Sequence, residues 1–287
     1  MPTVPDPAEP DRPRLRAGAA ENPGGSHRPS TEDLTTERRE YERHGGDHVA
    51  RYRWAAPSVR GGRVLDVGCG HGFGAVFLRG TYGEYVGVDL DPEALDWAKR
   101  VVEPATPGAT FRPSTDLGAL GSFDVITCFE VIEHVSDPGG LLSTVQRAAA
   151  PGGLVFLSTP NGSLSAGRAE WFLSPFHLAE YTVQQFQAMV AETFRDPGRF
   201  LAQRRRDELD WLLPAIRARL LQRDPRASAG RGASGRPTPA GLQRGHAAFR
   251  RIPSPPGWWT LDRLPGTPRN LTRASHLLWT GRANGAT

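Results

Sequence analysis

A short apolar strand that runs directly into alternating glycines constrains this chain more than any other feature. Residues 63–74 read RVLDVGCGHGFG. Glycines at three alternating positions leave one side of the turn without Cβ atoms, so a ligand can lie directly on the backbone. The amides of the next helix's first turn would face that ligand. The sequence therefore predicts a ligand-binding turn formed by Gly68, Gly70 and Gly72.

A second strand, residues 85–89, reads YVGVD and ends in Asp89. A carboxylate at the end of a neighbouring parallel strand can accept hydrogen bonds from both hydroxyls of a ribose. The two features together predict a nucleoside cofactor. The spacing Gly70-x-Gly72-x-x-Ala75 also fits the dinucleotide fingerprint, so the turn alone leaves a dehydrogenase open.

Strand and helix signals alternate along residues 36–204. The Asp-Pro pairs at 91–92 and 137–138 are typical helix starts, and residues 182–185 form a capping box, T-x-x-Q. Such alternation predicts a doubly wound, mostly parallel α/β sheet with helices on both faces. Ligands of such sheets bind at the carboxyl ends of the strands.

Composition divides the chain into four parts. Residues 1–35 are rich in proline and charge, and we expect a disordered tail because they bury too little to offset their ordering entropy. Residues 36–204 form the core, beginning with a helix from about Thr36 to Ala56 that Pro57 would end. Residues 205–271 form an insertion with an Arg/Gly/Pro-rich linker, and residues 272–287 the last strand and a C-terminal tail.

Composition also limits location and partners. No run of 18 apolar residues occurs and residues 1–35 contain no apolar h-region, so we expect neither a transmembrane segment nor a signal peptide. Two cysteines, Cys69 and Cys128, favour buried thiols in a reducing cytoplasm over a disulfide. The net charge is +4, but Lys99 is the only lysine, and this arginine bias indicates a GC-rich genome more than a nucleic-acid surface.

Two further blocks distinguish between the cofactor classes. Residues 122–135 read SFDVITCFEVIEHV and residues 151–161 read PGGLVFLSTPN. In this order after the glycine turn, they resemble the class I S-adenosylmethionine (SAM)-dependent methyltransferases. The resemblance implies a Rossmann-like, seven-stranded sheet and SAM as cofactor. A dehydrogenase would need a nicotinamide subsite and a hydride-handling residue, and neither is visible.

The resemblance also implies the cofactor-binding residues. The glycine turn would pack on the methionyl and ribose parts, and Asp89 would hold the ribose. Residues 48–55, HVARYRWA, resemble a glycan-modifying subset in which an arginine could pair with the cofactor's carboxylate; an exposed helix arginine is the alternative. Asp116 matches the adenine position in a loop that departs from the family pattern, and a solvated turn is equally open. The full expected set is Arg51, Asp66, Gly68, Gly70, Gly72, Asp89, Leu90, Asp116, Phe129 and Glu130.

Two histidines are candidates for the base that takes a proton from the acceptor, because histidine titrates near neutrality. His134 follows Glu133 beside the expected methyl position. His177 lies in PFHLAEYT (residues 175–182), which resembles a block of the same subset. Either could instead be structural, His134 as a helix cap and His177 as a partner of Glu180.

Cys and His nowhere occur at metal-ligand spacing along the chain, so no metal site is expected. Base-modifying amino-methyltransferases carry (D/N)-P-P-(Y/F) where this chain has CFEV (residues 128–131), and this argues against nucleic acid as a partner. We therefore expect methyl transfer to a hydroxyl of a small molecule or glycan. An RNA methyltransferase and a non-catalytic SAM-binding protein are the alternatives, and the sequence gives no oligomeric state.

Overall fold

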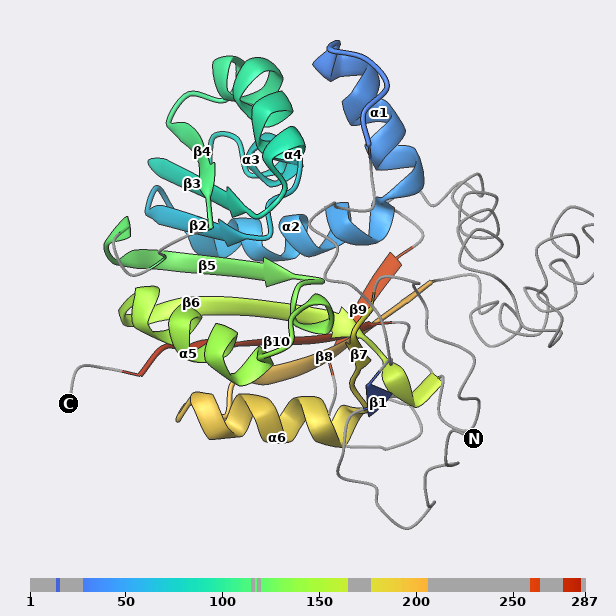
Figure 1. Ribbon diagram of the computed structural model, residues 1–287. Coiled ribbons are helices and arrows are strands. Elements are labelled where there is room, and N and C mark those ends of the chain that lie inside the picture. The colour runs from blue at the N-terminus through green and yellow to red at the C-terminus, as the bar shows by residue number, and fades with distance from the viewer. Residues whose placement is uncertain are drawn as a thin grey trace, which may run out of the picture.

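The computed structural model describes residues 14–15, 28–114, 117, 120–164, 177–205, 259–263 and 276–284. An open eight-stranded sheet forms its centre, in the order β4-β3-β2-β5-β6-β10-β8-β9 (Figure 1). The strands are β2 (Arg63–Val67), β3 (Glu84–Asp89), β4 (Ala109–Pro113), β5 (Phe123–Phe129), β6 (Ala149–Pro160), β8 (Arg199–Arg205), β9 (Trp259–Arg263) and β10 (His276–Arg282).

Five neighbouring strands, β4 to β6 in the sheet order, run parallel, and β10 runs antiparallel to both β6 and β8. The predicted α/β fold and its seven expected strands are confirmed. β9, which pairs with β8, is an eighth strand that the sequence did not indicate. Because β10 is antiparallel, its first residue lies at the edge where the parallel strands end.

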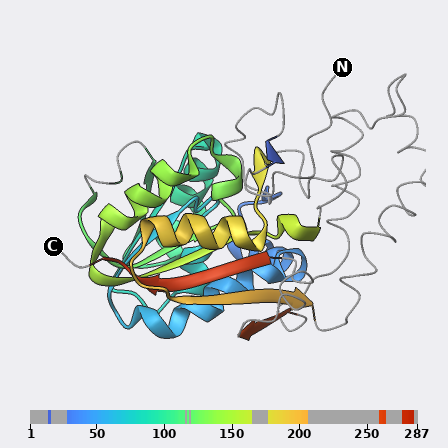
Figure 2. The same ribbon diagram turned by 90° about the horizontal axis from the view of Figure 1, so that it is seen from below.

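The helices cover both faces of the sheet (Figures 1 and 2). They are α1 (Leu34–His44), α2 (Gly46–Val59), α3 (Phe73–Phe77), α4 (Pro92–Trp97), α5 (Pro138–Ala148) and α6 (Val183–Thr193), with short 3₁₀ turns at Glu103–Ala105, Ile132–His134 and Gly162–Leu164. A π-helical turn, Ala98–Val102, continues α4. None of the helices in the described parts of the chain has the length and apolar character needed to cross a bilayer.

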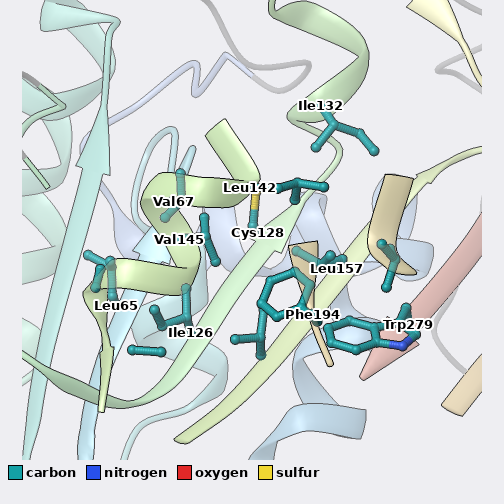
Figure 3. Packing of buried hydrophobic residues seen from close by; sticks show 14 of the residues in the cluster. Leu65, Val67, Ile126, Cys128, Ile132, Leu142, Val145, Leu157, Phe194 and Trp279 are labelled. Carbon is teal, nitrogen blue, oxygen red and sulfur yellow. The ribbon is translucent and has the colours of Figure 1, made fainter. Parts of the chain in front are cut away.

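Alternate residues of each central strand belong to different cores. In β2, Val64 packs with α2, α3 and α4, whereas Leu65 and Val67 pack with α5 and α6. Figure 3 shows the second core, where Leu142 and Val145 of α5 lie over β2, β5 and β6. Strands buried on both faces are typical of parallel sheets, and this explains the continuous apolar runs in the sequence.

The predicted helix starts are confirmed. The Asp91 side chain accepts hydrogen bonds from the backbone N–H groups of Glu93 and Ala94 at the start of α4. Asp137 caps α5 through Gly140, and the capping box at the start of α6 is complete.

The single helix predicted from Thr36 to Ala56 is wrong in two respects. Gly45, with φ −111° and ψ 33°, leaves the helical conformation and separates α1 from α2. Pro57 does not end α2, which continues to Val59 and stops at Arg60 in the left-handed conformation. Proline removes the hydrogen bond of its own nitrogen and its ring crowds the carbonyl four residues earlier, but burial of Ala55 and Val59 on the sheet keeps the last turn helical.

Parts of the expected tail and insertion have defined contacts. β1 (Arg14–Leu15) pairs antiparallel with β7 (Ala179–Glu180). The backbone N–H groups of Ser30 and Thr31 donate to buried Glu37. Residues 1–13, 16–27, 206–258 and 264–271 lie outside the described residues, so the disordered tail, insertion and linker predicted there stay predictions.

A carboxylate is buried beneath the glycine turn. Asp66, only 1% exposed, accepts hydrogen bonds from the hydroxyls of Tyr52, Tyr85 and Thr127. Burial raises the pKa of Asp66 to about 6, although the three hydroxyls partly oppose the shift. Gly74 lies directly over the carboxylate, and an added Cβ there would collide with Asp66 and Tyr85. Asp66 therefore joins α2, β3 and β5 beneath the first turn of α3.

Because the pKa of Asp66 is higher in the folded than in the unfolded state, its contribution to stability is present at about pH 4 and is lost as the pH rises to about 6. Replacing Asp66→Asn should remove this dependence. The unfolding free energy of the wild type relative to Asp66→Asn should fall by up to about 3 kcal/mol over that range. Denaturant unfolding from pH 4 to pH 7 measures the difference.

Asp196→Asn is the matched control. Backbone N–H groups of Gly198 and Arg282 lower the pKa of Asp196, so its effect should be confined to below about pH 4. Equal pH dependence of the wild type and Asp66→Asn between pH 4 and 6 would show that Asp66 is not protonated in the fold.

Candidate functional site

The glycine turn lies at the carboxyl edge of the sheet, between the ends of β2, β3 and β5. The N–H groups of Gly68 and Cys69 donate to the Val88 carbonyl of β3, at 2.8 and 3.0 Å. Gly70 has φ +52°, and an added Cβ there would meet nothing within 4 Å. The turn is thus anchored on one side and open on the other, as a backbone surface for a ligand requires.

We call the unobstructed space above Gly70 the opening. Asp89 lies beside this opening, at the end of β3. It is 9% exposed, and its Oδ2 accepts a hydrogen bond from the Gly70 N–H at 2.7 Å while Oδ1 accepts one from Asp91 N–H at 2.9 Å. Burial raises the pKa of Asp89 against these N–H donors. Leu90 follows at 62% exposure, the one large apolar side chain in the described residues that is left exposed. The two residues offer a carboxylate and an apolar surface side by side.

The end of β5 closes the opposite side of the turn. Phe129 is 5% exposed and meets Tyr52 edge to face, with the ring centroids 5.3 Å apart. Glu130 has φ +59°, a left-handed conformation that is unusual for a residue other than glycine. The Val131 side chain lies against Gly68, where a Cβ would collide with it. The predicted residues of β5 are therefore brought next to the glycine turn.

Arg51 of α2 is fully buried and reaches the same edge. Its Nη2 donates to Asp47 Oδ2 and its Nε to Gln203 Oε1 of β8, both at 2.9 Å. Its Nη1 lies 3.7 Å from Glu130 Oε1 and has no hydrogen-bond partner among the described residues. A buried donor without a partner is rare in native proteins and marks a position where a ligand's acceptor could bind. The exposed-arginine alternative is excluded.

The charged groups around Arg51 shift the pKa values of their neighbours and oppose the effect of burial on the carboxylates. Burial would raise the pKa of Glu130, but the charges of Arg51 and His276 outweigh it and hold that pKa well below its usual range. The same competition lowers the pKa of Asp47, where His48, Arg51 and His276 outweigh burial. Burial, followed by the Arg51 charge, lowers the pKa of His48 to about 4.

Both candidate histidines lie in one cluster. The rings of His134 and His177 are 5.0 Å apart and nearly perpendicular. His177 is 6% exposed, and its Nδ1 is 2.8 Å from Glu180 Oε1. The His134 side chain is 28% exposed, with Nε2 3.9 Å from Glu133 Oε1. A hydrogen bond from Leu178 N–H to the Glu133 carbonyl holds the two segments together.

The side chains of this cluster weaken the prediction, made from the spacing of Cys and His along the chain, that no metal site is present. Ligand atoms of Glu133, His134 and His177 all lie within 4.8 Å of one another. Glu133 Oε1 is buried without a hydrogen-bond partner among the described residues, and burial followed by the charge of Glu130 raises the pKa of Glu133 well above its usual range. Spacing along the chain did not reveal this group because His177 joins from a distant segment.

The structure thus brings most of the predicted residues into two groups, one around the opening and the other formed by His134 and His177. The glycine turn, Asp89, Leu90, Phe129, Glu130 and Arg51 lie around the opening, Asp66 lies beneath it, and Asp116 lies outside the described residues. The sequence analysis missed Asp47, Ser158, Gln203 and His276. Asp47, at i−4 from Arg51 on a predicted helix, was the one partner that spacing could have indicated.

Comparisons with known proteins identify the family. A family model described as a methyltransferase domain matches residues 38–226. The ubiquinone biosynthesis O-methyltransferase of Xanthomonas oryzae pv. oryzae is 30% identical over 195 residues, covering 58% of this chain and 80% of that protein. The protein of the same name from Thiobacillus denitrificans is 38% identical over 118 residues, 39% of this chain and 50% of that one.

The chain spans about half the length of several curated relatives that it matches. Among solved structures, the [4+2]-cyclase SpnF aligns with a TM-score of 0.50 over 92% of this chain and 90% of that one, at 15% identity. This likeness concerns the fold alone, since a shared fold does not carry a shared reaction. The family model, the X. oryzae relative and the order of the sheet together show that this chain belongs to the methyltransferase-domain family, as the resemblance to class I SAM-dependent methyltransferases predicted.

Proposed function

We propose that this protein is a SAM-dependent O-methyltransferase that acts on a hydroxyl of a small molecule. One arrangement at the carboxyl edge of the sheet carries the proposal: the Asp89 carboxylate borders the open space above Gly70, and Arg51 Nη1, beside Glu130 at the end of β5, is buried without a hydrogen-bond partner among the described residues. A nucleoside joined to an amino acid matches this pair, because it offers ribose hydroxyls at one end and a carboxylate at the other. The relatives' names support oxygen as the acceptor atom.

The residues around the opening have separate tasks in this proposal. Asp89 accepts from the ribose hydroxyls, Leu90 lies against the base, and Arg51 Nη1 donates to the carboxylate. The turn from Gly68 to Gly72 carries the ligand on its backbone. Phe129 and Glu130 close the site from β5, and Asp66 acts indirectly by holding the turn. When bound, SAM supplies an electrophilic methyl carbon on a sulfonium.

On the acceptor side, a base must remove the hydroxyl proton. With its Nδ1–H donating to Glu180, His177 has the lone pair on Nε2, the atom that would accept the proton. His134 is more exposed and forms the outer part of the same cluster.

A saccharide hydroxyl is the second acceptor class in this proposal. The free, buried Cys69 and Cys128 support a reducing compartment such as the cytoplasm.

Isotopically labelled SAM tests the function directly. The protein is incubated with extracts and with a panel of phenols, catechols and saccharides, and labelled products are sought by mass spectrometry. A labelled methyl ether supports the proposal. Binding of SAM without any labelled product across extracts and panel would favour a SAM-binding protein without turnover, and label in RNA would favour the nucleic-acid alternative.

Asp89→Ala should lower SAM affinity by roughly ten- to a hundredfold, because a charged hydrogen-bond pair contributes about 1.5–3 kcal/mol. Isothermal titration measures the affinity, and a thermal melt checks the fold. Asp96→Ala is the control, since that carboxylate lies on the exposed side of α4, paired with Arg100. Wild-type affinity in a folded Asp89→Ala protein would remove Asp89 from the cofactor site.

His177→Ala should lower turnover by roughly 10²- to 10⁴-fold, the usual effect of losing a general base, while SAM affinity stays nearly unchanged. His134→Ala should disturb both quantities, since His134 belongs to the turn that follows Glu130. A fully active His177→Ala protein with unchanged SAM affinity would transfer the role to His134 or exclude a base.

A further inference from the structure

A polar cluster that the sequence did not predict surrounds the Arg51 guanidinium. Its members come from five elements or their ends: Asp47 and Arg51 from α2, Glu130 directly after β5, Ser158 from β6, Gln203 from β8 and His276 from β10. Gln203 and His276 are direct partners across the β8–β10 pair. Neither has a role in the proposed reaction so far.

The donors of Arg51 are unevenly used. A guanidinium has five N–H groups, and burial makes each one without a partner costly. Gln203 accepts from Nε and Asp47 from Nη2, and Gln203 also donates from Nε2 to the Asp47 carbonyl, so this side is rigidly held. The Nη1 side faces Glu130 Oε1 at 3.7 Å, beyond hydrogen-bonding distance.

Other contacts keep Glu130 at this distance. Its Oε1 accepts from the Ser158 hydroxyl at 2.7 Å, and its Oε2 lies 3.3 Å from His276 Nε2. Its backbone N–H is bonded to Ser158, and its φ of +59° restricts the direction of the side chain. A free carboxylate this close to a buried guanidinium would otherwise close into a two-point ion pair, the strongest geometry available to both.

We propose that His276 is a positioning residue for cofactor binding: it holds the Glu130 carboxylate away from Arg51 and thereby keeps Nη1 open for the carboxylate of the cofactor's amino-acid part. This inference rests on the proposed function, which assigns that carboxylate to Arg51. Without His276, Glu130 would rotate onto Nη1 and compete with the ligand. The last strand of the sheet thus prepares a binding site formed by the first helices and β5.

Two ligands that differ by one group test the inference. S-adenosylhomocysteine has the carboxylate, and its decarboxylated analogue, with a 3-aminopropyl thioether, lacks only that group. His276→Leu should weaken binding of S-adenosylhomocysteine by about tenfold or more and leave the analogue's affinity unchanged. His276→Gln, whose amide can still donate toward Glu130, should restore most of the loss. Isothermal titration measures the wild type and both variants with each ligand, and thermal melts check folding.

Equal weakening of both ligands by His276→Leu would reduce His276 to a structural residue and overturn the inference. The Glu130→Ala background gives a second test: with no carboxylate to hold away, adding His276→Leu should cause no further loss of S-adenosylhomocysteine affinity. A loss that persists there would also overturn the inference. If the single His276→Leu variant melts early, the comparison of Glu130→Ala with the double variant Glu130→Ala/His276→Leu still decides the test.

Arg51→Lys separates this inference from the proposed function. A lysine amine does not reach the Nη1 position in the same fork geometry, so this variant should weaken S-adenosylhomocysteine selectively if Arg51 binds the carboxylate. If Arg51→Lys affects both ligands alike, the proposed carboxylate subsite is wrong. If Arg51→Lys discriminates between the ligands and His276→Leu does not, the subsite stands and the role of His276 is refuted.

Discussion

The buried guanidinium of Arg51 is the interaction on which the carboxyl edge of this sheet depends. A charge without solvent contact is tolerated only when surrounding groups compensate it, and here α2, β5 and β8 all contribute. Its partners therefore tie the N-terminal helices to the last strands of the sheet. Asp47 and Gln203 hold one side of the guanidinium rigidly, whereas the buried Nη1 has no hydrogen-bond partner among the described residues.

Two buried aspartates at the ends of neighbouring strands show how position decides role. Asp66 has its oxygens engaged by three hydroxyls and lies beneath the glycine turn. Asp89 lies beside the opening and accepts from the turn's own backbone at Gly70. Burial raises both pKa values, yet only Asp89 borders the opening where a ligand can approach. A raised pKa alone would therefore not distinguish a structural aspartate from one that binds a ligand.

Several features could be predicted from local sequence because their causes are local. The Asp91 and Asp137 caps and the capping box at Thr182 depend on a few adjacent residues, and the apolar runs of the strands follow from burial on two faces. The glycine turn and Asp89 followed from strand ends that share one edge. The predicted single helix was wrong at Gly45, where a glycine breaks it locally, and at Pro57, where packing on the sheet outweighs the local signal.

The sequence by itself determined the family, the parallel core and the turn that faces the ligand, since each is written in residues close together along the chain. Only the tertiary structure decided which groups meet at the site. Gln203 reaches Arg51 and its cross-strand partner His276 reaches Glu130 through the register of the β8–β10 pair, and His177 joins Glu133 and His134 beside the hydrogen bond from Leu178 N–H to the Glu133 carbonyl. These contacts join segments far apart along the chain, 152 residues in the case of Arg51 and Gln203, and their distances follow from strand register and helix packing, which no local pattern encodes.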